Sequence, residues 1–343
     1  MKAMVLKRVT PLEDCATPLE MLDWPEPVAG DGEILVKVSV CGVCHTELDE
    51  IEGRTAPERL PMVLGHQVVG RVAALGQGAE GFAIGERVGV AWIHSACGQC
   101  SHCLAGDENL CAEFKATGRD AYGGYAEYMT VRADFAHSIP SLFTDAQAAP
   151  LLCAGAIGFR SLRLTGIEDG QNLGLTGFGA SAHLVLKMVR HQFPRTKTFV
   201  FARNAEERDF AMGLGAVWAG APEAFSPEKL YGIIDTTPVW SSIVEALKNL
   251  RPGGRLVINA IRKEETDKSA LLGLDYPSHL WMEKEIKSVA NVSRADVRGF
   301  LRLAAEIPLH PEIEEFALED ANRALLELKT RRVRGAKVLR VAS

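Results

Sequence analysis

The chain has 343 residues, enough for about two domains of ordinary size, and 47% of them are hydrophobic and 24% charged. This composition excludes a disordered or fibrous protein, and the net charge of -6, which forms no basic stripe, argues against nucleic acid as a partner. Because no apolar segment reaches signal-peptide length or the roughly 20 residues of a membrane span, we predict a cytoplasmic protein with no membrane partner.

Up to about residue 140 the sequence predicts short β-strands. In ILVKVSV, residues 34–40, apolar residues alternate along one face, and VVGRVAAL, GERVGVAWI and GGYAEYMTV follow between glycine-rich turns. Residues 1–153 are therefore predicted to form a mostly antiparallel, β-rich domain. Near its end Thr144 and Gln147 match a capping box, which predicts that an alanine-rich helix begins there and runs towards Cys153.

Four cysteines lie close together inside this β-rich region. Their spacing, C-x2-C-x2-C-x7-C, lets four thiolates converge tetrahedrally on one Zn²⁺, and the residues are Cys97, Cys100, Cys103 and Cys111. Cytosolic thiols are kept reduced, so clusters of them bind metal more often than they form disulfides. A site closed by four sulfurs leaves no position for substrate, and we expect it to hold a loop. Four free thiols are the alternative.

From about Gln171 the pattern changes to alternating strands and helices. The sequence predicts helices after Gly179, at NAEERDFAMGLG and from Trp240 to Leu250, and strands at NLGLTG, TKTFVFAR, YGIIDTTP, GGRLVINAI and IKSVANV. This alternation predicts a doubly wound parallel sheet for residues 154–290, so the chain belongs to the α/β class. In residues 291–343 we expect the helix ADVRGFLRLAAE and two strands, IEEFAL and AKVLRVA, which return to the first domain.

The first βα turn of this region, LTGFGASAH, matches the dinucleotide-binding pattern G-x-G-x-x-G/A. Gly177 makes the turn, Gly179 lets the backbone approach a pyrophosphate, and Ala182 allows close packing of helix on strand. The phosphates would accept hydrogen bonds from the first N–H groups of the helix, which begins at Ala180 and Ser181. The alternative is that these glycines only make a tight turn.

The end of the second strand bears on the choice of nicotinamide cofactor. An Asp or Glu is expected there when the ribose hydroxyls of NAD are bound, but the sequence has Ala202, Arg203 and Asn204. A guanidinium is well shaped for a 2′-phosphate, so the sequence favours NADP(H), with NAD(H) as the alternative. Arg203 could instead be a solvated residue at the start of a helix, paired with Glu206 or Glu207.

Three more candidate metal ligands are scattered along the chain. CGVCHT contains Cys44, LGHQ contains His66 and LLCAGAIG contains Cys153. Two thiolates and one imidazole would leave the fourth position of Zn²⁺ open, which is the arrangement of a catalytic site. Taken singly, His66 is as well explained as a core histidine and Cys153 as a small apolar residue.

Taken together and in this order, CGVCHT, GHQ, the four-cysteine stretch, LLCAGAIG and the GxGxxA turn resemble a zinc-dependent alcohol dehydrogenase of the medium-chain dehydrogenase/reductase superfamily. The resemblance covers essentially the whole chain. It implies a GroES-like catalytic domain, a Rossmann cofactor domain and an active-site cleft between them. It also implies two Zn²⁺ per chain, a catalytic one on Cys44, His66 and Cys153 and a structural one on the four-cysteine stretch.

The same resemblance implies roles for several other residues. Thr46 matches the hydroxyl that passes on the alcohol proton, His45 matches a residue near the cofactor pyrophosphate, and Trp92 matches an aromatic residue that lines the substrate pocket. Glu47 is a candidate for orienting His66 from behind the metal. Thr46 and Glu47 could instead do no more than start a helix.

Several positions depart from the family pattern. Many relatives have Glu where Gln67 stands, and Asp49 occupies the position of a relay histidine. We therefore expect different ligand exchange at the metal and a proton relay through Asp49 or water. An aromatic residue that commonly narrows the pocket is also missing from EGRTAPERL, which suggests a cleft for more than the smallest alcohols.

The resulting hypothesis is an oxidoreductase that interconverts small-molecule primary or secondary alcohols with aldehydes or ketones. By analogy with the family we expect a homodimer or homotetramer that pairs through the edge of the Rossmann sheet, where IKSVANV is the candidate edge strand. The alternatives are an NAD-preferring enzyme of the same family and a non-catalytic, dinucleotide-binding redox sensor. A sensor would be expected to have lost Thr46 or one of the three open-site ligands, and all four are present.

Overall fold

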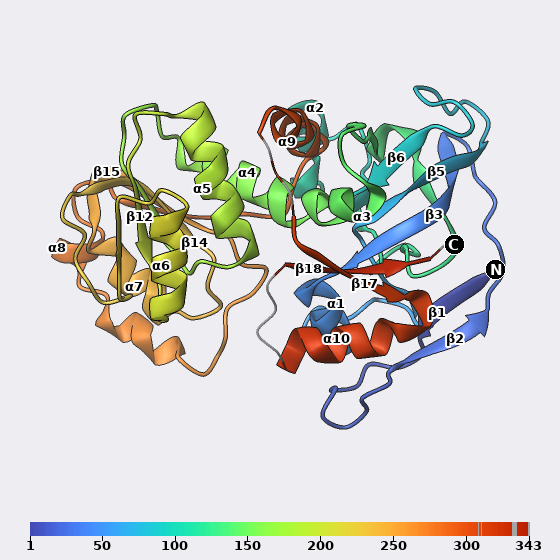
Figure 1. Cartoon of the computed structure of the whole chain (residues 1–343), viewed down its shortest axis with the longest axis horizontal. Helices are drawn as coiled ribbons and strands as arrows, with labels where there is room; N and C mark the ends of the chain where they lie inside the picture. The colour runs from blue at the N-terminus through green and yellow to red at the C-terminus, as the bar shows by residue number, and fades with distance from the viewer. Residues whose placement is uncertain (308, 310, 331–334, 342–343) are drawn as a thin grey trace. The chain divides into compact units, whose positions relative to one another are not determined.

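The computed structural model describes residues 1–307, 309, 311–330 and 335–341. The chain divides into two compact units, coloured along the sequence in Figure 1. The first unit comprises Met1–Cys153 and Val292–Ser343, and the second comprises Ala154–Asn291. Among the described residues, no helix has both the length and the apolar character needed to cross a membrane.

The first unit is built mainly on antiparallel strands. They are β1 (Lys2–Leu6), β2 (Leu19–Asp23), β3 (Glu33–Val43), β4 (Met62–Val63), β5 (Val68–Leu75), β6 (Arg87–Val90), β7 (Ile93–Ser95), β8 (Lys115–Ala116), β9 (Tyr128–Arg132), β10 (Ala136–Ser138), β17 (Ile313–Ala317) and β18 (Ala336–Arg340). The largest sheet has the order β10-β6-β5-β3-β18-β17, with β9 also paired to β3. Strands β2-β1-β4 and β7-β8 form two smaller sheets.

Strand β3 is the centre of this unit because it pairs antiparallel with β5, β9 and β18. The alternation predicted for residues 34–40 is present, since Ile34, Val36 and Val38 are fully buried and Lys37 is exposed. Strand β18 comes from the C-terminal segment and pairs with the end of β3. The end of β3 leads directly into the first helix, so the sheet fixes where that helix begins.

The helices of the first unit are α1 (His45–Ile51), α2 (Ser101–Leu104), α3 (Asp145–Ala148), α9 (Arg294–Glu306) and α10 (Ala321–Thr330), with short 3₁₀ turns η1 (Glu108–Leu110), η2 (Ala133–Phe135), η3 (Ala149–Leu152) and η5 (Leu318–Asp320). The capping box at Thr144 is confirmed, because its hydroxyl accepts the Gln147 N–H and the Gln147 side chain accepts the Thr144 N–H. The predicted continuous helix to Cys153 is wrong. The α-helix ends at Ala148, and the chain continues as the 3₁₀ turn η3, where Pro150 has no N–H for an α-helical hydrogen bond.

The second unit contains one parallel sheet. Its strands are β11 (Leu173–Thr176), β12 (Thr198–Phe201), β13 (Trp218–Gly220), β14 (Leu230–Asp235), β15 (Leu250–Ile258) and β16 (Glu285–Ser288), in the order β13-β12-β11-β14-β15-β16. Its helices are α4 (Ala154–Thr165), α5 (Ala180–Gln192), α6 (Ala205–Gly213), α7 (Ser241–Leu247) and α8 (Tyr276–His279), with the 3₁₀ turn η4 (Lys268–Gly273). The prediction of a doubly wound parallel sheet is confirmed, and β16 is one of its edges. The strand order reverses between β11 and β14, and ligands of such sheets bind outside the carboxyl ends of the strands at this point.

A buried histidine makes the stability of the first unit depend on pH. His137 in β10 is 4% exposed, and burial together with the positive charges of Arg298 and Arg294 lowers its pKa to about 3. The ring is therefore neutral in the fold, whereas in the unfolded chain it gains a proton below its ordinary pKa. The contribution of the neutral ring to the free energy of unfolding is fully present above the pKa of the unfolded chain. It is lost as the pH falls from there towards the pKa of the folded state. The loss is about 2 kcal/mol between pH 7 and pH 5.

We expect a His137→Phe variant to lose less of its free energy of unfolding between pH 7 and pH 5 than the wild type, by about this amount. Urea titrations at both pH values measure the difference. Substitution of the exposed His191 by Gln is the control and should leave the pH dependence unchanged. Equal pH dependence of the wild type and the His137→Phe variant would contradict the prediction.

Candidate functional site

The three scattered candidate ligands meet in the first unit. Cys44 follows β3 and precedes α1, His66 lies between β4 and β5, and Cys153 follows η3. Their donor atoms all lie within 4.8 Å of one another. The two sulfurs are 3.9 Å apart, and His66 Nε2 lies 3.3 Å from the Cys153 sulfur. Tetrahedral Zn²⁺ would require about 3.8 Å between sulfurs and about 3.6 Å between sulfur and nitrogen, so the three donors fit this ion.

The two thiols of this group are electrostatically linked. Their shared hydrogen bond lowers the pKa of Cys44 well below its ordinary value and raises that of Cys153 well above it. Both residues are free cysteines. A second negative charge so close to the first requires a nearby cation, which is the condition that a bound metal ion would satisfy.

Glu47 forms hydrogen bonds with two of these candidate ligands, Cys44 and His66. Its side chain is fully buried, with one oxygen 2.5 Å from His66 Nδ1 and the other accepting the backbone N–H of Cys44 at 2.7 Å. A neutral His66 that donates its Nδ1 hydrogen to this carboxylate presents the Nε2 lone pair to the thiols. Burial alone would lower the pKa of His66, but the charge of Glu47 and the hydrogen bonds to Cys44 and Glu47 together outweigh burial and raise that pKa.

Helix α1 carries the predicted catalytic residues. The Thr46 hydroxyl is half-buried and lies 3.7 Å from the Cys44 sulfur, whereas His45 is exposed. Asp49 is buried and accepts a hydrogen bond from the Arg54 guanidinium. Thr46 is thus in contact with a candidate metal ligand, while the predicted relay position Asp49 is part of an ion pair.

The same helix contains an acid that no sequence motif singles out. Glu50 is 1% exposed, and neither carboxylate oxygen has a hydrogen-bond partner in the described part of the chain. Burial, and then the charge of Glu47, raises the pKa of Glu50 well above its ordinary value. The only sequence signal for Glu50 is the composition of its helix, HTELDEI. This helix has three acids and only two apolar residues, Leu48 and Ile51.

The predicted pocket residue Trp92 packs inside the first unit. It is 7% exposed, its ring lies 5.3 Å from that of Phe114, and the Arg119 guanidinium lies over it at 5.4 Å. The indole N–H has no acceptor among the described residues. The indole therefore has both a packed face and an unused donor.

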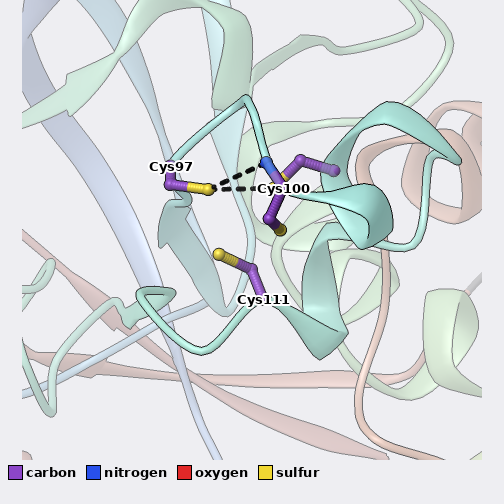
Figure 2. A group of neighbouring side chains, drawn as sticks. Cys97, Cys100 and Cys111 are labelled. Atoms are coloured by element: carbon purple, nitrogen blue, oxygen red, sulfur yellow. Dashed lines mark hydrogen bonds between the residues drawn. The ribbon is translucent and has the colours of Figure 1, made fainter.

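The four-cysteine lobe, residues 97–111, brings its sulfurs together around α2 and η1. All four lie within 4.8 Å of one another, and Figure 2 shows the Cys97, Cys100 and Cys111 side chains turned towards a common centre. Backbone N–H groups of Gln99 and Cys100 lower the pKa of Cys97 to about 7, whereas burial raises the pKa of Cys103 to about 12. The lobe is tied to α9, because Glu108 accepts the backbone and side-chain N–H groups of Arg294. Four converging thiols fit a closed tetrahedral Zn²⁺ site.

The glycine-rich turn of the second unit has the geometry of a phosphate-binding turn. Gly177 has a φ of +74°, and a Cβ there would lie 2.9 Å from Thr236 Oγ1. Gly179 caps α5, and a Cβ on it would meet no described atom within 4 Å. Open space therefore lies beside the helix N-terminus, which begins at Ala180 and Ser181, while Ala182 is buried against the sheet.

The segment after β12 presents a free guanidinium. Ala202 is buried, Arg203 is exposed, and the Arg203 side chain has no ion-pair or hydrogen-bond partner among the described residues. Asn204 caps α6 and donates to Glu207, so Glu207 is engaged elsewhere. Arg208 donates to the carbonyl oxygens of Ala202 and Arg203 at 2.8 and 2.9 Å, which holds this turn in place.

Comparisons with known proteins agree with this geometry. Residues 30–141 match the profile of the alcohol dehydrogenase GroES-like domain. The chain is 40% identical over 344 residues to the "Probable alcohol dehydrogenase AdhA" of Mycobacterium tuberculosis (strain CDC 1551 / Oshkosh), with 99% of this chain and 97% of that protein covered. The chain belongs to the medium-chain alcohol dehydrogenase family. The family resemblance predicted from the motifs is thereby confirmed.

Two further relatives extend this result. An alcohol dehydrogenase of Geobacillus stearothermophilus is 30% identical to this family member, and the match covers 96% of this chain and 98% of that protein. Among solved structures, a cinnamyl alcohol dehydrogenase of Sorghum bicolor has a TM-score of 0.82 and 27% identity, with 100% of this chain and 98% of that chain covered. The predicted GroES-like and Rossmann fold classes are confirmed for this alcohol dehydrogenase.

Each cysteine group of this alcohol dehydrogenase should bind its own metal ion. We expect the purified protein to hold one Zn²⁺ for each of the two groups. Cys153→Ser should lose the ion at the three-ligand group and keep the thermal stability, whereas Cys103→Ser should lose the other ion and unfold at lower temperature, because four-cysteine sites stabilise loops. Elemental analysis and thermal unfolding measure both.

Cys15 is the matched control, since it is free and lies in neither group. Cys15→Ser should leave both the zinc content and the stability unchanged. An unchanged zinc content in Cys153→Ser would show that the three-ligand group does not hold the ion.

Proposed function

We propose that the protein is a zinc-dependent alcohol dehydrogenase and aldehyde or ketone reductase that prefers NADP(H) to NAD(H). The observation that carries this proposal is the convergence of Cys44, His66 and Cys153 beside the Thr46 hydroxyl. Three protein donors of these types leave one position of a tetrahedral ion open. A closed site would serve structure alone.

The bound groups and the protein side chains would have different roles in the reaction. When bound, Zn²⁺ would supply Lewis acidity towards the oxygen of the alcohol or carbonyl substrate, and the nicotinamide would accept or donate the hydride. Glu47 keeps the His66 ring in the orientation and tautomer that a metal ligand needs. Thr46 accepts the alcohol proton during oxidation and returns it during reduction, because its hydroxyl can both accept and donate a hydrogen bond.

Beyond Thr46 the proton must reach solvent. His45 is the exposed neighbour on α1, and Asp49 shares its carboxylate with Arg54. A carboxylate that accepts a guanidinium hydrogen bond has fewer lone pairs left for another donor. We therefore propose that the proton leaves through water near His45. The negative charge of Asp49 would stabilise the proton on its way to solvent.

Arg203 supports the preference for NADP(H). It follows the second strand of the parallel sheet and is exposed, and its side chain has no partner among the described residues, while the acid that would bind NAD ribose hydroxyls is replaced by Ala202. A planar guanidinium binds a 2′-phosphate through paired hydrogen bonds. NAD(H) preference is the alternative. Small primary or secondary alcohols and the matching aldehydes or ketones are the proposed substrates, and Trp92 is proposed to line their pocket.

The thiol ligands also bear on where the protein works. Zinc-binding cysteines must remain reduced, and this requirement supports the proposed cytoplasmic location. The edge strand β16 supports the proposed homodimer, since Glu285, Ile286, Lys287 and Ser288 are all exposed. Antiparallel pairing of two copies about Ile286 would place Glu285 of each copy opposite Lys287 of the other, which makes the edge self-complementary.

The proposed activity can be tested with a panel of aldehydes, followed by nicotinamide absorbance with NADPH and with NADH. We expect faster turnover with NADPH. Arg203→Ala should raise KM for NADPH on the order of tenfold with little effect on NADH, because only NADPH carries the 2′-phosphate. Thr46→Val should lower kcat on the order of 10²-fold through loss of proton transfer.

Thr46→Ser is the matched control for Thr46→Val and should retain most of the activity, since it keeps the hydroxyl. Equal use of both cofactors by the wild type would overturn the NADP(H) preference alone. No turnover with any aldehyde, combined with zinc in the four-cysteine lobe only, would favour the redox-sensor alternative.

The proposed dimer predicts that Ile286→Lys converts the protein to a monomer. A charge in place of Ile286 would lie against the same charge of the second copy on pairing. Light scattering after size-exclusion chromatography gives the molecular mass of each variant in solution. Val217 precedes β13 at the opposite edge of the sheet and is 51% exposed, so Val217→Lys is the control and should remain a dimer or tetramer. A monomeric wild type would contradict the proposal.

A further inference from the structure

A buried lysine lies at the carboxyl edge of the parallel sheet in the second unit. The Lys263 side chain is 7% exposed. Its ammonium group donates to a carboxylate oxygen of Asp235 and to the backbone oxygens of Thr237 at 2.7 Å and Val239 at 3.2 Å. An ammonium has three hydrogens, so all of them are used. Lys263 thereby ties the segment after β15 to the segment after β14.

Asp235 extends this connection to a third strand. It is the last residue of β14, is fully buried and lies in register with Thr176, the last residue of β11. The carboxylate oxygen that does not bind Lys263 accepts the hydroxyls of Thr176 at 2.5 Å and Thr237 at 2.8 Å. The Lys263–Asp235 pair therefore lies where the strand order of the sheet reverses, and it connects the ends of β11, β14 and β15.

Backbone contacts give the same segments a fixed arrangement. Asn259 donates its N–H to the Asp235 carbonyl at 2.7 Å, and Glu264 donates to the Pro238 carbonyl at 2.8 Å. The segment after β14 also packs on the glycine-rich turn, since a Cβ at Gly177 would lie 2.9 Å from Thr236 Oγ1. Thr236 is itself held on β11, because its N–H and its hydroxyl both donate to the Thr176 carbonyl, at 3.0 and 2.9 Å, so its contact with the turn does not depend on Lys263.

The position of the pair indicates which part of a dinucleotide it affects. A doubly wound sheet of this order binds one mononucleotide in each half. The glycine-rich turn after β11 and Arg203 after β12 belong to the half that binds the adenosine end. The carboxyl ends of β14 and β15 are left for the nicotinamide end. These are the ends that Lys263 joins.

We propose that Lys263 is a positioning residue for the nicotinamide half of the cofactor. By holding the segments after β14 and β15 through three hydrogen bonds, it fixes the wall of the crevice against which the nicotinamide riboside binds. The adenosine half does not depend on it. This inference rests on the proposed nicotinamide cofactor and adds to it the residue that orders one half of the cofactor site.

The test compares binding of whole dinucleotides with binding of their adenosine fragments. Calorimetry would give Kd for NADPH and NADH, and for the fragments ADP-ribose and its 2′-phosphorylated form, which lack the nicotinamide. Lys263→Met alone leaves a buried, unpaired Asp235, so the double variant Asp235→Asn with Lys263→Met is measured beside it. In the double variant we expect dinucleotide binding to weaken on the order of tenfold and fragment binding to change less than about twofold.

Lys284→Met is the matched control. Lys284 is half-buried in the same unit and also donates to two carbonyl oxygens, those of Leu247 and Ser278, but it precedes β16 and so lies at the amino end of that strand. Its dinucleotide Kd should not change. Retained fragment binding shows that a variant is folded.

Two results would overturn the inference alone: equal weakening of dinucleotide and fragment in the double variant, or no weakening of either. A wild-type protein that binds neither dinucleotides nor fragments would overturn the proposed function, and this inference with it. The two failures are therefore distinguishable.

Discussion

The buried carboxylate of Glu47 is the interaction on which the three-ligand group depends. Its two oxygens engage the backbone N–H of Cys44 and the ring of His66, which lie at the ends of different strands. A fully buried carboxylate is costly unless every oxygen is hydrogen-bonded or faces a cation. Its position therefore requires both partners at once. One carboxylate thus sets the start of α1 and the direction of the imidazole, and a metal ion on the far side of His66 would compensate its remaining charge.

The acids that follow Glu47 on α1 are compensated unequally. Asp49 accepts the Arg54 guanidinium, whereas Glu50 is buried without a hydrogen-bond partner in the described part of the chain. Burial raises the pKa of Glu50, so its neutral form is favoured. Helix α1 therefore places one hydrogen-bonded carboxylate, one ion-paired carboxylate and one carboxyl group that resists ionisation within seven residues. Its acids differ in role because their surroundings differ and not because of their residue type.

The features that could be predicted from the sequence are those whose partners are close along the chain. The four-cysteine spacing, the capping box at Thr144 and the turn at Gly177 each fit within a short segment, so local geometry determines them. Cys44 and Cys153 are 109 residues apart, and only the family resemblance joins them in advance. The three bonds of Lys263, to residues 24 to 28 positions away along the chain, had no such guide. They arise from the way that separate segments fold back on one another, which neither periodicity nor residue type specifies.

The two cysteine groups contain the same thiol chemistry in donor sets of different size. In the four-cysteine lobe every donor is a sulfur, and Glu108 anchors the lobe to α9 through Arg294, so the group has the full donor set of a closed tetrahedral site. The other group has three Cys or His donors in the described part of the chain, and the Thr46 hydroxyl lies 3.7 Å from one of them, the Cys44 sulfur. An incomplete coordination shell next to a proton acceptor is the arrangement that catalysis on an alcohol oxygen requires. The number of donors, three against four among the described residues, therefore distinguishes the group proposed to be catalytic from the group expected to hold a loop.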